Sequence, residues 1–281
     1  MKRSVLLLIV TSILWSTGGL LIKLVDLNSV SVAGYRGLIT ACFLLFFVKK
    51  SVLRFSWNKV LGAISYASMT ILCVMATKAT TAAGAILLQY TSPIYIAIFG
   101  GLLLKEKPNL RDWMVILFIF AGMSMFFLDG NSSNDLMGNI YGALSGVAMA
   151  FNTIFMRREK AADPLQNVFW GSILTVVITS PSMIANVPGK ESWLGLALLG
   201  IFQLGLAYLL YSIAIKSIPA LQATLICLIE PLLNPVWVFL TIGEIPGRLS
   251  ILGGAIILVF VALSSVGTVK TNSRAVSVSG S

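Results

Sequence analysis

The chain of 281 residues is 57% hydrophobic and only 11% charged, and its mean hydropathy is +0.93. Soluble domains carry about 25% charged residues, so this composition excludes a soluble fold and predicts a protein embedded in the lipid bilayer. The formal net charge is +10, but the basic residues lie at the ends of apolar stretches, which is typical of membrane topology and argues against a nucleic-acid partner.

Ten apolar stretches of helix length follow one another along the chain, each near the ~20 residues that cross ~30 Å of hydrocarbon. Their approximate bounds are 4–22, 31–48, 59–77, 82–104, 112–128, 137–156, 166–185, 193–214, 219–242 and 249–267. The connections are too short for a soluble domain, so the sequence predicts an all-α membrane protein with ten transmembrane helices. The first stretch could instead be a cleaved signal peptide, but it lacks a small-x-small cleavage site.

The second half of the chain repeats landmarks of the first half after a constant interval of 138 residues. These are the pairs Lys78 and Lys216, Pro93 and Pro231, Glu106 and Glu244, and Pro108 and Pro246. Five spans per copy is an odd number, so the second copy must cross the membrane in the opposite orientation. The sequence thus predicts two inverted five-helix repeats, residues 1–130 and 131–268, followed by a disordered cytoplasmic tail over 269–281.

The distribution of positive charge predicts the orientation of the chain. Fifteen of the twenty Lys and Arg residues fall in segments that the ten spans place on the same side as the N-terminus, and four fall on the opposite side. Because cytoplasmic loops are enriched in Lys and Arg, both termini are expected in the cytoplasm.

A set of short motifs accompanies the repeat. They are Trp15-Ser16, Tyr35-Arg36, Thr91-Ser92-Pro93, Lys105-Glu106-Lys107-Pro108, Ile229-Glu230-Pro231 and Gly243-Glu244-Ile245-Pro246. This combination resembles the drug/metabolite transporter superfamily, specifically its EamA-type ten-helix carriers, over residues 4–267. The resemblance implies a central cavity lined mainly by helices 1, 3, 4, 6, 8 and 9, and the export of a small metabolite. It does not specify the substrate.

Glu230 is the first candidate functional residue. It lies 11 residues into the span that starts near residue 219, about 16 Å deep at 1.5 Å per residue. A carboxylate at that depth costs at least ~2.5 kcal/mol, so it should face protein or water and be either protonated or paired. We expect Glu230 to couple transport to protons or to bind an amine of the substrate; the alternative is a structural hydrogen bond from a protonated acid.

Pro93 and Pro231, at matched positions, are predicted hinges, and Pro235 follows one turn after Pro231. Each proline removes a backbone hydrogen bond and bends its helix. Proline is also commoner in membrane helices than in soluble ones, so the bends could be structural only.

Arg36 lies within the second span, about 8 Å below its outer end. It could bind a carboxylate, hydrogen-bond neighbouring helix ends or extend its side chain to the membrane surface. Further polar and aromatic residues inside the spans could line a pocket for an organic molecule, although packing alone would also explain each of them. This predicted substrate site comprises Trp15, Thr17, Gln89, Tyr90, Tyr95, Asn152, Tyr211, Glu230, Asn234 and Trp237.

The chain contains no histidine and no phosphate-binding glycine-rich loop, so no metal site or cofactor is predicted. We expect a multi-pass protein of the bacterial inner membrane, a monomer or homodimer, that exports an amino acid or related compound by alternating access. One alternative is a facilitator or importer of a vitamin-like cofactor. Another is a membrane enzyme acting on lipid head groups, but such enzymes need interfacial Asp, Glu or His clusters, so we expect no enzyme.

Overall fold

The computed structural model describes residues 2–48, 55–106, 108–128, 136–242, 249, 252–253, 255–256 and 259–260. All regular elements of the described chain are helices. The first half contains α1 (Lys2–Ser16), α2 (Gly18–Leu24), α3 (Ser29–Leu44), α4 (Trp57–Ala79), α5 (Ala82–Gln89), α6 (Ser92–Leu103) and α7 (Leu110–Leu128). The second half contains α8 (Leu136–Arg158), α9 (Leu165–Ala185), α10 (Ser192–Ala197), the π-helix η2 (Leu198–Leu206), α11 (Ala207–Ala214), α12 (Ala220–Ile226) and α13 (Ile229–Ile242).

Several of these helices are long and apolar enough to cross a membrane. They are Lys2–Leu24, Trp57–Ala79, Ala82–Leu103, Leu165–Ala185, Ser192–Ala214 and Ala220–Thr241. Helices α3, α7 and α8 overlap three further predicted spans. The tenth predicted span, 249–267, and the predicted tail lie largely or wholly outside the described residues. The chain is therefore a multi-pass, all-α membrane protein in its described part.

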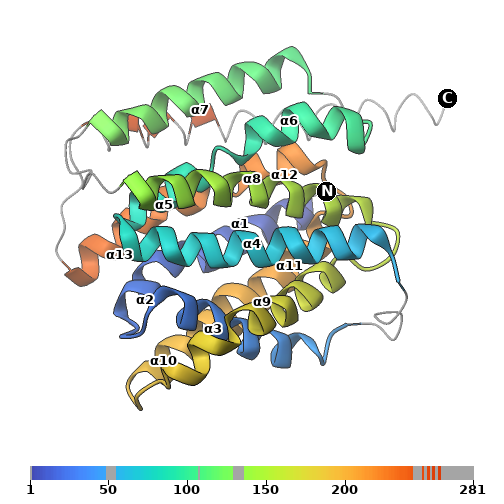
Figure 1. Ribbon diagram of the computed structural model, residues 1–281. Coiled ribbons are helices and arrows are strands. Elements are labelled where there is room, and N and C mark those ends of the chain that lie inside the picture. Colours follow the sequence, from blue (N-terminus) through green and yellow to red (C-terminus); the bar gives the residue numbers. More distant parts are fainter. Residues whose placement is uncertain are drawn as a thin grey trace.

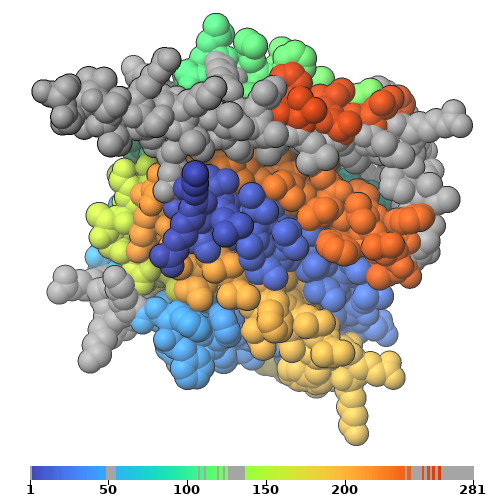
Figure 2. All heavy atoms as spheres, turned by 180° about the vertical axis from the view of Figure 1, so that it is seen from behind, coloured from blue at the N-terminus to red at the C-terminus, as the bar shows by residue number. Residues whose placement is uncertain are grey.

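The bundle is built by contacts between the two halves of the chain. Helix α4 packs along α8 and α9, and α3 packs against α9 and η2. Helix α1 packs against α11 and α13, and the view from behind shows it among the orange helices of the second half (Figure 2). Figure 1 shows α7 at one edge of the bundle and α10 at the other. The core accordingly lies where helices of both halves meet.

Polar side chains are concentrated inside the bundle, and large apolar ones face outward. Exposed positions include Leu6, Leu102 and Ile184, whereas Thr40 and Thr175 are fully buried. Lipid tails are as apolar as leucine, so exposure of leucine carries no cost in a membrane and small polar residues can pack the interior. The buried hydroxyls are satisfied locally: Thr40 donates to the Arg36 carbonyl at 2.8 Å and Thr175 to the Gly171 carbonyl at 2.8 Å.

Two transmembrane segments are interrupted at matched positions. One segment breaks between α5 and α6 at Tyr90–Thr91, and the other breaks between α12 and α13 at Cys227–Leu228. Pro93 and Pro231 each lie in the first turn of the second helix of their pair, where a missing N–H costs least. The chain thus divides into two helices before each proline, in place of the bend expected within one continuous helix. Pro235 lies inside α13.

Candidate functional site

A cavity lies between the two halves of the bundle, beside both helix breaks. Its volume is about 40 Å³, room for on the order of three water molecules. The polar lining consists of Arg36, Thr70, Cys73, Thr77, Gln89, Gln203, Tyr208 and Glu230. The apolar side chains that line it are Trp15, Ile22, Met69, Ile86, Met149 and Leu204, with Gly18 and Gly19 completing the wall. An organic metabolite does not fit in this volume, so the cavity must widen before it can bind one.

Glu230 enters the cavity from the first turn of α13 and is 7% exposed. The hydroxyl of Tyr90, in the opposite helix break, lies 2.6 Å from Glu230 Oε2. The same hydroxyl lies 2.8 Å from the carbonyl oxygen of Cys227. Because Pro231, four residues later, has no N–H, the backbone donor to this carbonyl is the N–H of Glu230, at 3.0 Å. Tyr90 thus joins the two helix breaks through one side chain, although it does not itself line the cavity.

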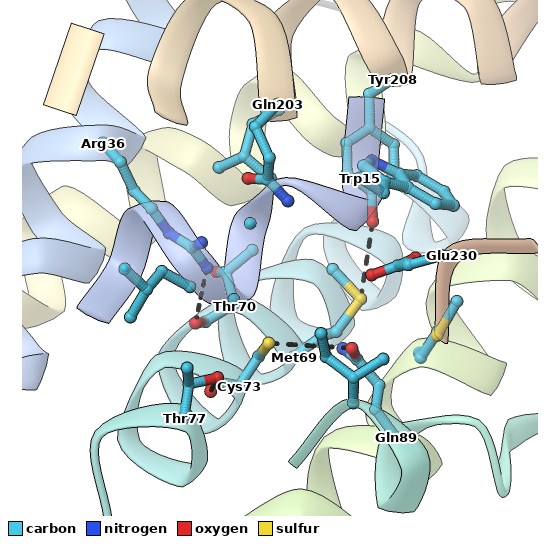
Figure 3. Close-up of a pocket in the computed structure, with 16 residues that line it drawn as sticks. Trp15, Arg36, Met69, Thr70, Cys73, Thr77, Gln89, Gln203, Tyr208 and Glu230 are labelled. Carbon is cyan, nitrogen blue, oxygen red and sulfur yellow. Dashed lines mark hydrogen bonds between the residues drawn. The ribbon is translucent and has the colours of Figure 1, made fainter. Parts of the chain in front are cut away.

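Arg36, on α3, also lines the cavity and is 2% exposed. Its Nη2 donates a hydrogen bond to the Thr70 carbonyl of α4 at 3.0 Å, and its Nε has no partner. Figure 3 shows Arg36 and Glu230 on opposite sides of the cavity, with Gln203 and Cys73 between them. Among the described residues no carboxylate lies within ion-pair distance of Arg36.

Comparison with known proteins assigns the chain to a family. The sequence pattern of the EamA-like transporter family matches residues 2–128 and again residues 136–266. The chain belongs to the EamA-like transporter family. The two matches indicate repeated halves, and the family is one of transporters within the drug/metabolite transporter superfamily, not one of enzymes.

Similar proteins extend this result over most of the chain. An uncharacterized transporter of Archaeoglobus fulgidus is 24% identical over 284 residues, covering 94% of this chain and 98% of the relative. The uncharacterized transporter YdfC of Bacillus subtilis is 24% identical over 203 residues, which cover 70% of this chain and 66% of YdfC. A crystal structure with a TM-score of 0.78 covers 94% of this chain and 98% of its own chain. At 20% identity it shows the shared fold alone.

Trp15, Gln89 and Glu230, three residues of the predicted substrate site, line the cavity of this EamA-family protein together with Arg36. Gln89 accepts a hydrogen bond from the Cys73 thiol at 3.7 Å. The Trp15 ring lies 5.0 Å from that of Tyr208 and 5.3 Å from that of Tyr211, measured between centroids. Trp15 and Tyr208 form one wall at the Glu230 end of the cavity, where Figure 3 shows both beside Glu230.

The other predicted site residues lie outside the cavity lining. Asn234 donates to the Ser16 carbonyl at 2.9 Å and Trp237 to the Ser16 hydroxyl at 2.7 Å. One turn of α13 thereby holds the end of α1, where Thr17 separates α1 from α2 and donates to the Leu14 carbonyl at 2.8 Å. Their predicted role in binding remains a prediction, and their contacts here are between helices.

Tyr95, Asn152 and Tyr211 also have surroundings made of protein. Tyr95 is half-buried against the main core, and Asn152 is buried on α8 with no partner for its Oδ1. Tyr211 is buried, and its hydroxyl lies 3.4 Å from the Thr153 hydroxyl.

Sequence reasoning missed several residues that line the cavity, among them Met69, Cys73, Gln203 and Tyr208. Gln203 lies in the π-helix η2 and is buried, and its Oε1 has no partner. Short π-helical stretches are frequent at functional sites. A glutamine inside the otherwise apolar span 193–214 was the available signal for Gln203. Methionine and cysteine carried none, because both are ordinary core residues.

A polar cluster closes one end of the bundle. Glu106, after the end of α6, pairs with Arg157 at 2.7 Å and accepts the backbone N–H of Ala220 at 3.0 Å. Arg157 also donates to the carbonyls of Ile215 and Lys216, at 2.6 and 2.8 Å. We name these contacts the Glu106 latch. It joins the ends of α6, α8 and α11 to the start of α12; the repeat-related Glu244 lies outside the described residues.

Proposed function

We propose that this protein is a secondary active transporter that moves a small organic metabolite across the membrane by alternating access. The substrate is an amino acid or a related compound, the net direction is export, and both termini lie in the cytoplasm of a bacterial cell. The observation that carries this proposal is the buried Glu230 at a cavity where one broken helix from each half of the chain meets the other.

The arrangement of helix contacts supports two inverted five-helix repeats. Helix α4, the third predicted span, packs on α8 and α9, the sixth and seventh. The eighth span, formed by α10, η2 and α11, packs on α1 and α3, the first and second. If the two halves of the chain are exchanged, each set of contacts becomes the other. The same exchange turns one helix break into the other. In transporters built this way, the repeats move against each other around a site near the membrane midplane.

The Glu106 latch supports a closed conformation. It ties the end of α6, in the first repeat, to the ends of α8 and α11 in the second. The cavity of about 40 Å³ lies inside this closed bundle. Separation of the latch would open one face of the site while contacts at the other face, such as that of Asn234 with Ser16, stay in place.

Counting hydrogens at Tyr90 supports proton coupling through Glu230. The tyrosine hydroxyl carries one hydrogen, and a protonated carboxyl carries another. With Glu230 protonated, Glu230 donates to Tyr90, and Tyr90 donates to the Cys227 carbonyl, so every group has a partner. With Glu230 ionised, Tyr90 must donate to Glu230, and the Cys227 carbonyl keeps only the backbone N–H of Glu230, at 3.0 Å, as a donor. Proton loss therefore changes the bond that joins the two helix breaks.

Reconstitution of the purified protein in lipid vesicles tests this function. The vesicles are loaded with a mixture of the twenty proteinogenic amino acids and a panel of vitamins, and the contents are followed by mass spectrometry with and without a pH gradient. We expect gradient-driven movement of at least one compound by the wild type. At a raised concentration of that compound, Glu230→Gln should still exchange it but lose the dependence on the gradient, and the exposed control Glu191→Gln should behave as wild type.

The other outcomes decide against parts of the proposal. Full gradient-driven accumulation by Glu230→Gln would remove the coupling role. Movement of a vitamin that never depends on pH would indicate a facilitator. Conversion of a compound into a product, without its movement, would contradict the transporter function itself.

A further inference from the structure

Arg36 is a buried cation whose charge no described group compensates. It is 2% exposed, it makes one hydrogen bond to a neutral carbonyl, and its Nε donor is unpartnered. An ion pair of the described residues, Glu106–Arg157, lies at the end of the bundle. Burial of a charge is costly unless the charge is paired. The guanidinium at the cavity wall is therefore suited to an anion that arrives from outside the protein.

The surroundings of Arg36 fit a carboxylate. A guanidinium offers donors in a planar fork that matches the two oxygens of a carboxylate, and Nε of Arg36 is free to take part. Gln203 lies between Arg36 and Glu230 in Figure 3. Because the amide of a glutamine holds two donor hydrogens as well as an oxygen, Gln203 can contact either end of a bound molecule.

The opposite end of the cavity fits an ammonium group. Glu230 provides a carboxyl group there, and the rings of Trp15 and Tyr208, 5.0 Å apart, lie beside it. Ammonium groups bind carboxylates and the faces of aromatic rings. The side chains of Met69, Ile86, Met149 and Leu204 complete the lining, and apolar linings of this kind enclose the apolar part of a ligand.

We propose that Arg36 and Glu230 are the two ends of a zwitterion site, which takes the carboxylate of the substrate at Arg36 and its ammonium group at Glu230. The substrate class is then an α-amino acid with an apolar side chain, or a compound with the same pattern of charges. This inference rests on the proposed transport function, because the site is the one that the two repeats enclose. A simple amine leaves Arg36 without an anion, and a simple acid leaves Glu230 without a cation, so the site selects against both.

Three matched compounds test the proposal on the wild-type protein in lipid nanodiscs. They are L-leucine, 3-methylbutan-1-amine, which lacks the carboxylate, and 4-methylpentanoate, which lacks the amine. Binding is measured by calorimetry and by the rise in melting temperature. We expect the amino acid to bind at least about 100-fold more tightly than either analogue, since each analogue leaves a buried polar group unpaired. If another of the twenty amino acids binds more tightly than leucine, its own amine and acid analogues replace these probes.

Variants assign each end of the ligand. Arg36→Gln should reduce binding of the amino acid to the level of the amine and leave the amine unchanged. Glu230→Gln should reduce binding of the amino acid to the level of the acid. The exposed Arg158 provides the control, since Arg158→Gln removes the same charge outside the cavity. The comparison of the three compounds on the wild-type protein does not depend on any variant. It therefore tests the zwitterion site even if Arg36→Gln fails to fold.

Equal binding of the amine or the acid and the amino acid would overturn the proposal, as would the failure of all twenty amino acids to bind at millimolar concentration. The vesicle assay separates this failure from that of the transport function. Movement of an amine or an acid, but of no amino acid, would leave a transporter without a zwitterion site. Tight binding of the amino acid without its movement across the vesicle membrane would support the zwitterion site and contradict the transport function.

Discussion

The hydroxyl oxygen of Tyr90 lies 2.6 Å from Oε2 of Glu230, and this contact joins the helix break of the first half to that of the second. Tyr90 is the residue directly after α5, and Glu230 is the second residue of α13. Because the hydroxyl also lies 2.8 Å from the Cys227 carbonyl, any change in the charge of Glu230 alters the bonding of both breaks. Tyr90 is therefore placed to transmit that change to the packing of the two halves.

Tyr90→Phe should uncouple transport from the pH gradient. The substitution keeps the ring but removes the hydroxyl that contacts Glu230 and the Cys227 carbonyl. That carbonyl still accepts the backbone N–H of Glu230, so we expect the fold to lose only about 0.5–1.5 kcal/mol. Exchange of substrate should continue in vesicles while gradient-driven accumulation falls. The matched control is Tyr35→Phe. It removes a hydrogen bond of 2.9 Å from the Tyr35 hydroxyl to the Met183 carbonyl, and Tyr35 does not line the cavity. If Tyr90→Phe accumulates substrate as wild type does, the link through this hydroxyl has no role in coupling.

Glu106→Ala should release the Glu106 latch. The carboxylate binds both Arg157 and the N–H of Ala220, and its side chain is 24% exposed, so we expect a loss of about 1–2 kcal/mol. Hydrogen–deuterium exchange should become faster over residues 215–220, which the latch holds. Glu191→Ala, at an exposed site on the connection before α10, should leave this exchange unchanged. Equal protection of 215–220 in wild type and Glu106→Ala would contradict the latch.

Gly19→Ala should weaken the packing of α2 against α13. A Cβ at residue 19 would lie 2.6 Å from Nδ2 of Asn234 and 3.0 Å from the Cβ of Ala82. Overpacking of this kind costs about 1–3 kcal/mol, and it should displace the amide that holds Ser16. A lower melting temperature should follow. Gly101→Ala is the control, since a Cβ there has no neighbour within 4 Å; an equal loss in both variants would exclude the packing explanation.

Cys73 should report on occupancy of the cavity. Its side chain lines the cavity, whereas Cys227 is fully buried and Cys42 is exposed on α3. In a Cys42→Ser, Cys227→Ser background, a transported compound should slow the reaction of Cys73 with methyl methanethiosulfonate, as measured by mass spectrometry. In a Cys73→Ser, Cys227→Ser background, the same compound should leave the rate at Cys42 unchanged. Protection of Cys42 but not Cys73 would place the binding site elsewhere.

Hydropathy and repeated landmarks predicted much of the fold. The described helices overlap the predicted spans, and the two matches to the EamA-like family agree with repeated halves. The prolines predicted distortion at matched positions, and the structure shows complete breaks before Pro93 and Pro231. The difference has a local cause. The N–H groups in the first turn of a helix have no partner within that helix, so the missing N–H of a proline costs little there. Beginning a new helix therefore costs less than bending an existing one.

The residues of the cavity were harder to predict. Glu230 stood out because a carboxylate inside an apolar span is rare, and it does line the cavity. Asn234 shares its helix face in the sequence, yet its amide donates to the Ser16 carbonyl. Arg36 was expected about 8 Å below the outer end of its span, in a structural role or bound to a carboxylate, and it lines the same cavity as Glu230. Spacing along a helix gives the relative direction of side chains but not which neighbouring helix they meet.

The sequence by itself determined that this chain occupies a membrane, how long its helices are and that its halves are related. These properties follow from the transfer of apolar side chains into lipid and from the need of each backbone group for a partner within its own helix. Only the tertiary structure decided that Arg36, Gln203 and Glu230 face one cavity and that Tyr90 bridges the two breaks. The rotation of each helix about its axis is set by packing against helices far away in the sequence, and local pattern carries little information about that packing.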